Sequence, residues 1–311
     1  MGKPIVVFGS FVVDLTSRSA GLPVPGQTIL GSWFKYGPGG KGSNQAVAAH
    51  RAGADVTLVT KLGRDMFADV ALDFYKAEGM RTDFILRDDE KPTGVALILV
   101  DEESAQNEIV VVPGACQNIT PEDVTRSRGL IEGASILLLQ HEINADAQRA
   151  AIGIAHAAGV RIVLNPAPAM PVPDDLLAKI DIVTPNETEA QALTGVAVTD
   201  EAQARRAAKV FLDKGVKNVV ITMGAMGVFV TDGERSEMLP RLQVDAVDTT
   251  GAGDAYNGGF VTALSEGRDL FQAARYGNAA GALSVTRLGT APAMPSRAEI
   301  DALVKQSYGL E

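Results

Sequence analysis

The sequence predicts an α/β protein built on a mostly parallel sheet with helices on both faces. Two observations lead to this prediction: short β-rich runs alternate with amphipathic stretches along most of the chain, and those stretches carry helix start and end signals. Parallel strands need crossover connections, so the alternation favours the parallel arrangement. The runs expected as strands are IVVFGS, DVTLVTKLG, SILLLQ, RIVLNPAP, DIVTPN and NVVITMG.

Two of the connecting segments have clear helix boundaries. In NADAQRAAIGIAHAAG (144–159), Asn144 or Asp146 is expected to cap the start and Gly159 to follow the end. The segment DEAQARRAAKVFLDKG (200–215) has the same kind of pattern. Both are expected to be scaffold helices.

Two regions interrupt the alternation, at about residues 12–37 and 91–115. The second contains TGVALILVD and NEIVVVPGA joined by EESAQ, which predicts a β-hairpin. We expect the two regions to form a small β-sheet lid over one face of the main body. The chain has no internal repeat or flexible linker, so residues 1–311 are expected to form a single domain.

Composition excludes several classes of function. The chain has 311 residues, of which 46% are hydrophobic, and a net charge of −10, so it can bury a large core and is a poor candidate for binding nucleic acid. The single cysteine, Cys116, excludes an internal disulfide, and the three histidines are not spaced for zinc. The N-terminal run suits a buried strand better than a signal peptide, and no apolar stretch is long enough to cross a membrane. A cytoplasmic protein is expected.

Polar or glycine-rich motifs follow several predicted strands. Ligands of open parallel sheets bind beyond the carboxyl ends of the strands. Each motif alone could be a turn with a helix cap, but their shared position favours a binding site there. The motifs are Gly9 to Asp14, Gln140 to Glu142, Asn165 to Pro168, Thr184 to Glu187 and Thr222 to Ala225.

The stretch DTTGAGD (248–254) precedes a helix-like run and matches neither the P-loop nor the dinucleotide-binding pattern. Gly251 and Gly253 allow a tight turn in which the amides of residues 251–254 face one point beside a helix N-terminus. Asp254 in that turn could be a simple partner for the helix dipole. Alternatively, it accepts a proton from a hydroxyl nucleophile while the amides hold phosphoryl oxygens, as a phosphoryl transferase requires.

A second glycine-rich stretch, GPGGKGSNQA (37–46), is expected to open a helix running to about Ala52. Its glycines allow a ligand to approach the backbone, and Lys41 and Asn44 can donate to hydroxyls. The alternative is a flexible loop in which Ser43 caps the helix. Asp14 and Glu142, each following a predicted strand, are carboxylates that could bind sugar hydroxyls.

These motifs resemble, in order and spacing, those of the ribokinase (PfkB-type) family of carbohydrate kinases. The matching stretches are GGKGSNQA, NPAPA (165–169), TPNETEA (184–190) and DTTGAGDAYNGG, and the resemblance covers essentially the whole chain. It implies a three-layer fold with a central, mostly parallel sheet flanked by helices and a small β-sheet lid. It also implies ATP-dependent transfer of the γ-phosphoryl group to the 5-hydroxyl of a pentose, with D-ribose first and 2-deoxyribose next.

The resemblance also implies roles for individual positions. Asp254 would be the catalytic base, with Gly251, Ala252 and Gly253 as the anion hole. The remaining expectations are a sugar site (Val12, Asp14, Gly40, Lys41, Asn44, Glu142), an ATP site (Asn186, Thr222, Gly224, Gly227, Gly253, Asn278), a Mg²⁺ contact through water (Glu189) and a K⁺ site (Asp248, Thr250, Ser284, Arg287, Gly289). The family's lid commonly forms a dimer interface, so a homodimer is expected.

Val12 departs from the ribose-kinase pattern, which has Asn two residues before the sugar-binding Asp. Valine cannot bond a ribose hydroxyl, and an apolar wall rejects an added hydroxyl only weakly. The acceptor therefore stays open between ribose, 2-deoxyribose, another small sugar and a nucleoside. Outside this class, a non-catalytic sugar sensor and a dinucleotide-dependent oxidoreductase are the alternatives, and the failed dinucleotide motif argues against the latter.

Overall fold

The computed structural model of the chain describes residues 2–104 and 106–310. In this part, nine strands form the main sheet in the order β13-β12-β11-β10-β9-β8-β1-β4-β5. Neighbours from β11 to β5 are parallel, and β12 and β13 join antiparallel at one edge. The prediction of a mostly parallel sheet is confirmed, and all six expected strands are present. The bounds are β1 Ile5–Phe8, β4 Val56–Leu62, β5 Ile85–Arg87, β8 Ile136–Gln140, β9 Arg161–Asn165, β10 Ile182–Val183, β11 Asn218–Thr222, β12 Val228–Thr231 and β13 Ser236–Leu239.

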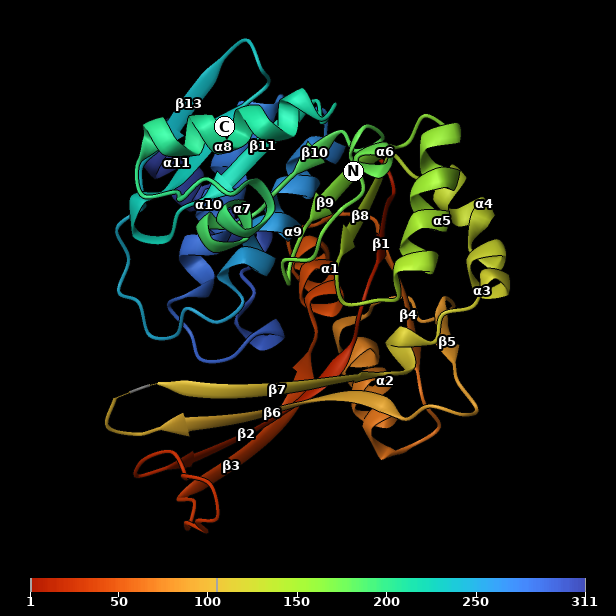
Figure 1. Cartoon of the computed structure of the whole chain (residues 1–311), viewed down its shortest axis with the longest axis vertical. Coiled ribbons are helices and arrows are strands. Elements are labelled where there is room, and N and C mark those ends of the chain that lie inside the picture. Colours follow the sequence, from red (N-terminus) through yellow and green to blue (C-terminus); the bar gives the residue numbers. More distant parts are fainter. Residues whose placement is uncertain (1, 105, 311) are drawn as a thin grey trace.

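Helices cover both faces of this sheet (Figure 1). One core packs against α1 Lys41–Arg51, α2 Met66–Glu78, α9 Ala252–Ser265, α10 Leu270–Ser284 and α11 Arg297–Tyr308. The other packs against α3 Pro121–Arg126, α4 Arg128–Glu132, α5 Ala145–Ala157, α6 Asp174–Leu177, α7 Glu187–Thr194 and α8 Glu201–Asp213. Alternate residues of β8 belong to opposite cores, Ile136 and Leu138 to the first and Leu137 and Leu139 to the second. Short 3₁₀ helices are η1 Ala115–Gln117, η2 Gly224–Met226 and η3 Ala291–Ala293.

The predicted helix ends hold with one exception. Asp200 caps α8 by accepting from the amide of Gln203 at 2.8 Å. Asn144 precedes α5, but its side chain makes no capping bond. Instead its amide group pairs with the backbone N–H and C=O of Ile119, so this contact to a neighbouring loop replaces the expected cap.

A separate four-stranded sheet projects from the main body (Figure 1), in the order β3-β2-β6-β7. It is formed by the two regions that interrupt the alternation, with β2 Val12–Ser19, β3 Trp33–Gly39, β6 Thr93–Asp101 and β7 Asn107–Gly114. The predicted hairpin is β6 and β7, which pair antiparallel, while β2 pairs parallel with β6. The prediction of a small second sheet is therefore confirmed.

Close packing of α1 on α9 brings the two glycine-rich motifs together. A Cβ on Gly258 of α9 would lie 2.3 Å from the Cβ of Ala48 in α1, so only glycine permits this approach. The N-terminal ends of both helices then meet beside the small sheet. None of the helices in the described part of the chain combines the length and hydropathy that crossing a bilayer requires.

Candidate functional site

Asp254 lies in the first turn of α9 and is only 7% exposed. Its Oδ2 accepts a hydrogen bond from Asn44 Nδ2 at 2.9 Å, and its Oδ1 accepts one from Gln45 Nε2 at 2.9 Å. Burial raises the pKa of Asp254, while Lys41 and the two amide donors lower it. The carboxylate is thus held from two sides by neutral donors of α1.

The glycine turn before Asp254 has the shape expected of an anion site. Gly251 is left-handed, with φ of 79°, and begins α9 as its N-cap. Within the described chain, the amides of Gly253 and Asp254 have no hydrogen-bond partner, as is usual in the first turn of a helix. The amide of Ala252, however, donates to the carbonyl of Thr249 at 3.3 Å, so it is less available than expected. Apart from its chain neighbours and the nearby backbone of α9, no described atom lies within 4 Å of the position a Cβ on Gly253 would take, which leaves room for a ligand.

A cluster of charged groups surrounds this carboxylate. Although burial disfavours the charged ammonium, the carboxylates of Asp254, Glu142 and Glu189 raise the pKa of Lys41. Glu142 accepts hydrogen bonds from the hydroxyl of Ser10 and from the backbone amide of Lys41. The structure therefore brings together groups from four segments of the chain, and Lys41 is the cation among them.

Asp14 joins the same cluster from the small sheet. Burial raises its pKa to about 6, with Glu142 and Asp254 adding to the rise and the hydroxyl of Thr290 opposing it. Thr290 Oγ1 bonds both Asp14 Oδ2 and the carbonyl of Pro38, each at 3.2 Å. This hydroxyl ties β2 and β3 to the loop that precedes η3.

Asn44 carries an unused acceptor at the site. Its Nδ2 donates to Asp254, whereas its Oδ1 is buried and has no hydrogen-bond partner in the described chain. A buried polar atom without a partner costs free energy, so a ligand hydroxyl is a natural complement. Gly40, with φ of 87°, lets the chain pass close to the backbone of Val12. Val12 itself is buried at the start of β2, opposite Gly94 of β6.

The residues expected at the nucleotide lie at the ends of β10 and β11. Asn186 bridges to Thr222, and its side chain forms a reciprocal capping box with Glu189 at the start of α7. Burial raises the pKa of Glu189, although the amide of Asn186 and Lys41 oppose this. Gly224 and Gly227 have positive φ values, 48° and 105°, in the turn that follows β11.

Asn278 lies in α10, and its amide nitrogen already has two acceptors. It donates to the carbonyl of Pro240 at 2.9 Å and to the hydroxyl of Tyr308 at 2.8 Å. These contacts join α10 to α11 and to the segment after β13. The side-chain nitrogen therefore has a structural partner whether or not a nucleotide is near.

The residues expected to surround a monovalent cation fall into two groups. Asp248 accepts from the amides of Thr250 at 2.9 Å and Gly289 at 3.0 Å, which places these three in contact. Ser284 and Arg287 lie at the end of α10, and the guanidinium of Arg287 turns away to pair with Glu299. Of the groups of Arg287, only the backbone carbonyl oxygen could bind a cation, because the guanidinium is itself positively charged. In the described residues, no cluster of three or more His, Cys, Asp or Glu side chains is close enough to hold a metal ion.

A family model described as pfkB family carbohydrate kinase matches residues 3–297. The chain belongs to the pfkB family of carbohydrate kinases. A ribokinase from Haemophilus influenzae is 43% identical over 299 residues, which is 96% of this chain and 97% of the relative. A deoxyribokinase from Salmonella typhimurium is 36% identical, covering 94% of this chain and 95% of the relative. A solved structure of Arabidopsis thaliana ribokinase complexed with ribose and ATP matches with a TM-score of 0.89 and 30% identity, covering 98% of this chain and 99% of that one.

The candidate site includes contacts that the sequence did not single out. Gln45 lies in the second glycine motif but had no expected role, and Ser10 and Thr290 were not expected to contact Glu142 and Asp14. The adjacency of Gln45 to Asn44 was the available signal. Its contact with Asp254 depends on how α1 packs on α9, which no local pattern reveals.

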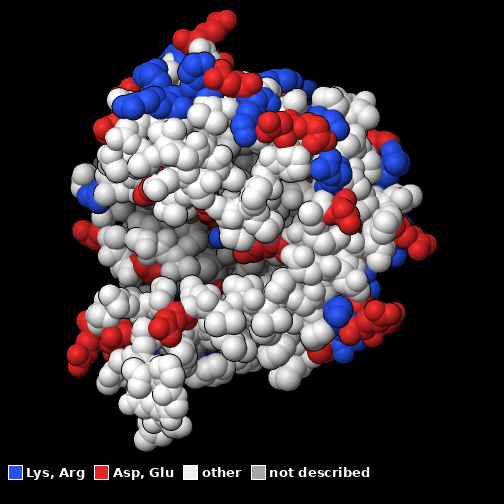
Figure 2. Space-filling model, in the orientation of Figure 1, with Lys and Arg blue, Asp and Glu red and all other residues white. Residues whose placement is uncertain are grey.

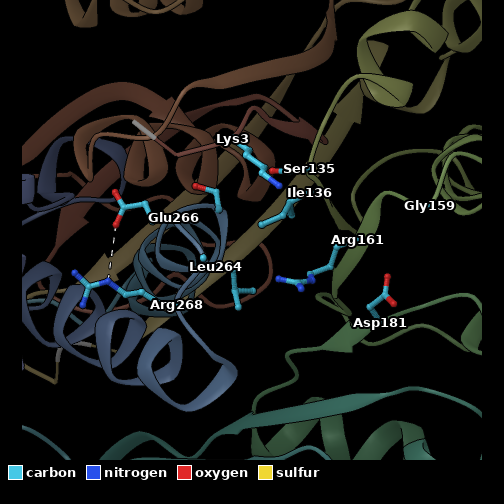
Figure 3. Close-up of a pocket in the computed structure, with 11 residues that line it drawn as sticks. Lys3, Ser135, Ile136, Gly159, Arg161, Asp181, Leu264, Glu266 and Arg268 are labelled. Carbon is cyan, nitrogen blue, oxygen red and sulfur yellow. Dashed lines mark ion pairs between the residues drawn. The ribbon is translucent and has the colours of Figure 1, made fainter.

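The surface has two separate hollows, and the candidate site belongs to only one of them. Figure 2 shows a deep groove between the main body and the projecting sheet, with acidic and basic side chains inside it. A different hollow of about 620 Å³ lies at the amino ends of the strands, between Lys3, Arg161 and Arg268 (Figure 3). None of the residues expected at the pfkB-family site lines it. Because ligands of parallel sheets bind at the carboxyl ends, the cluster around Asp254 is the candidate site.

Proposed function

We propose that the chain is an ATP-dependent sugar kinase that transfers the γ-phosphoryl group to the 5-hydroxyl of a pentose, with D-ribose the first candidate. The observation behind the proposal is the buried Asp254 carboxylate beside amides at the start of α9 that have no partner within residues 2–104 and 106–310. Membership of the carbohydrate kinase family and the ribokinase relatives support it. A base and an anion site in one turn are what phosphoryl transfer to a hydroxyl requires.

In the proposed mechanism, Asp254 accepts the proton of the sugar hydroxyl as its oxygen attacks the γ-phosphorus. The new O–P bond forms while the P–O bond to the leaving ADP breaks. The amides of Gly253 and Asp254, with Gly251 and Ala252 shaping the turn, stabilise the charge on the phosphoryl oxygens. Lys41 adds positive charge beside them.

The sugar would lie between α1 and β2. Asp14 and Glu142 accept from sugar hydroxyls, while the unpartnered Oδ1 of Asn44 accepts from another. Gly40 keeps the backbone close enough for this contact. Each carboxylate oxygen has more than one lone pair, so Glu142 can bind sugar while it holds Ser10.

ATP would lie along the ends of β10 and β11, against Asn186, Thr222, Gly224 and Gly227, with Gly253 at the phosphates and Asn278 behind. Glu189 has one oxygen in the capping box, and its other oxygen, which has no hydrogen-bond partner among the described residues, would face a water of Mg²⁺. Mg²⁺ commonly binds through few carboxylates and the substrate's own phosphates, so the absence of a larger acidic cluster among the described residues does not conflict with it. When bound, it neutralises phosphate charge.

K⁺ is proposed at the loop of Asp248, Thr250 and Gly289, with the carbonyls of Ser284 and Arg287 nearby. Asp248 is anchored there by two backbone amides. A bound cation would fix the loop that leads into the glycine turn. Activity is then expected to rise when K⁺ replaces a larger organic cation.

The lid is proposed to be part of a homodimer interface. Several large apolar side chains on the four-stranded sheet are exposed: Trp33, Phe34, Tyr36, Leu97, Ile109, Val110, Val111 and Val112. Exposed apolar patches of this kind mark interaction surfaces. The single-domain organisation and a cytoplasmic location also remain proposals.

The acceptor is the least constrained part of the proposal. The buried Val12 offers no hydrogen bond, so 2-deoxyribose, another small sugar or a nucleoside is the alternative substrate. A kinetic comparison of ribose, 2-deoxyribose, fructose and adenosine with MgATP and K⁺ tests this. A higher kcat/KM for ribose supports the first candidate, and a preference for another acceptor replaces it. If none of the four supports ATP consumption, further sugars are assayed: consumption with one of them identifies a different acceptor, and consumption with none favours a non-catalytic sensor.

A further inference from the structure

Gln45 makes three buried side-chain hydrogen bonds, one of them to Asp254, and no role proposed so far accounts for them. It is fully buried in α1, and its Nε2 donates to Asp254 Oδ1 and also to Asn165 Oδ1, each at 2.9 Å. Its Oε1 accepts from Gln140 Nε2 at 2.6 Å. Both ends of this amide are therefore fixed by buried neighbours, which sets the direction of its N–H groups toward Asp254.

The bond to Asn165 continues through the sheet and returns to α9. Asn165 Nδ2 donates to the carbonyl of Thr184 at 2.8 Å, and Thr184 Oγ1 donates to Asn257 Oδ1 at 2.7 Å. Asn257 Nδ2 then donates to the carbonyl of Gly253 at 2.8 Å. Since Gly253 precedes Asp254 in the chain, these contacts close a ring.

Burial shields the side chains of the ring from the bulk solvent that would compete for their hydrogen bonds. The side-chain members Gln45, Asn165, Thr184 and Asn257 are all buried. Each side-chain nitrogen and oxygen of these four residues has a hydrogen-bond partner, and buried networks satisfied in this way are rigid. Gln140, which holds Gln45 from outside the ring, keeps a buried Oε1 without a partner in the described chain. The ring joins α1, β9, the end of β10 and α9. The main sheet therefore supports both contacts of the ring with the glycine turn, from Gln45 to Asp254 and from Asn257 to Gly253.

We propose that this ring is a positioning device, in which Gln45 orients the carboxylate of Asp254 and Asn257 orients the peptide of Gly253. The proton acceptor and the amides that receive phosphoryl oxygens then keep a fixed mutual geometry. Gln45 and Asn257 are positioning residues and do not touch substrate. The proposal rests on the phosphoryl transfer proposed above.

The charges around Asp254 explain why such a device is needed. Lys41 attracts the carboxylate, while Asp14, Glu142 and Glu189 repel it. Without the amide donors, the carboxylate of Asp254 would turn toward the Lys41 ammonium group under ionic attraction. Ionic attraction has little directional preference, so it would not fix the orientation of the carboxylate. Neutral amide donors impose a direction and also stabilise the ionised form that accepts a proton.

The test is Gln45→Leu, which removes the donor and keeps a similar volume. We expect kcat to fall about 10- to 100-fold, since a shift of about 1 Å at the reacting groups has an effect of that order. The KM for ATP should change less than about twofold, because the nucleotide contacts are elsewhere. The acid limb of the kcat profile should move to higher pH, because the ionised base loses a hydrogen bond.

A matched control is Gln148→Leu. Gln148 is also buried, but it donates only to the carbonyl of Gln140, at 3.4 Å. The control should lose stability while kcat and its pH profile stay as in the wild type. A purely structural role for Gln45 would make the two variants alike, and that result overturns the proposal.

A crystal structure of Gln45→Leu gives a readout that does not depend on activity. We expect the Asp254 carboxylate to rotate toward Lys41, and an unchanged carboxylate with unchanged kcat would contradict the proposal. If Gln45→Leu does not fold, Asn257→Ala tests the other end of the ring: kcat should fall while the acid limb stays in place, and an unchanged kcat overturns the proposal. A wild-type enzyme that phosphorylates no sugar would refute the proposed function, and the crystal structure would still decide the role of the ring.

Discussion

Asn44 donates a hydrogen bond from Nδ2 to Oδ2 of Asp254 at 2.9 Å, across 210 positions of sequence. The bond links the two glycine-rich motifs, which lie near opposite ends of the chain. Each motif opens a helix, so the N-terminal ends of α1 and α9 converge on one carboxylate. The convergence puts backbone amides and the candidate base within one small site.

Replacing Gly258 tests whether this convergence depends on close helix packing. Gly258→Ala would force its new methyl group into Ala48, so we expect a loss of about 1 to 3 kcal/mol of stability and lower activity. Gly153 lies inside α5, and apart from its chain neighbours and the nearby helix backbone no described atom lies within 4 Å of the position its Cβ would take. The control Gly153→Ala should be neutral or raise stability by up to about 1 kcal/mol. Chemical denaturation measures the stability of both variants. Equal changes in stability would show that α1 and α9 do not pack closely enough to exclude a methyl group at residue 258.

The buried carboxyl of Asp14 predicts a pH-dependent change in stability. Its pKa is raised to about 6 in the folded chain, so the folded state holds the proton more tightly than the unfolded state. The stability this group contributes is complete below its ordinary pKa of 3.8 and is lost as the pH rises through about 6. Asp14→Asn should therefore raise Tm at pH 8 by a few degrees and raise it less at pH 4.

The control for this measurement is Asp73→Asn, on the exposed side of α2. It should shift Tm little and equally at both pH values. An Asp14→Asn variant with the same small shift at pH 4 and pH 8 would mean that the Asp14 carboxyl is well solvated. Sugar phosphorylation should fall in Asp14→Asn in either case, because one hydroxyl acceptor is lost.

A buried ion cluster around Lys61 of β4 predicts a large effect on stability. Lys61 is 5% exposed, and its ammonium lies 2.8 Å from Asp123 and 3.3 Å from Asp88. Lys61→Met leaves both carboxylates without their cation, so we expect a loss of about 3 to 5 kcal/mol. Lys209→Met removes an exposed pair with Asp213 and should cost less than about 1 kcal/mol. Similar losses from urea unfolding of both variants would contradict the buried role of Lys61.

Val12→Asn tests the pocket wall. An amide at this buried position could bond the hydroxyl that distinguishes ribose from 2-deoxyribose. We expect the ratio of kcat/KM for ribose over 2-deoxyribose to rise about tenfold or more, with the KM for ATP unchanged. An unchanged ratio would show that residue 12 does not face that hydroxyl.

Much of the scaffold follows from local patterns, and the remainder depends on packing. The six strands of the parallel sheet and the β6 and β7 hairpin were predictable because their apolar runs are continuous and bounded by turn residues. The strands β5, β12 and β13 were not predicted, because each has only three or four residues, and β5 and β13 are only partly buried. At the site, the motif residues were found from their spacing, whereas Gln45 and Thr290 act through contacts that exist only after the elements pack.

The central claim is that Asp254 accepts the proton of a sugar hydroxyl during phosphoryl transfer. The most direct test is the single-turnover rate of sugar phosphorylation by Asp254→Asn at saturating MgATP and K⁺, with ADP binding measured by calorimetry. The account predicts an unchanged ADP affinity and a rate lower by about 10²- to 10⁴-fold, because the neutral amide cannot accept the proton. A folded Asp254→Asn enzyme that phosphorylates sugar at nearly the wild-type rate would contradict it.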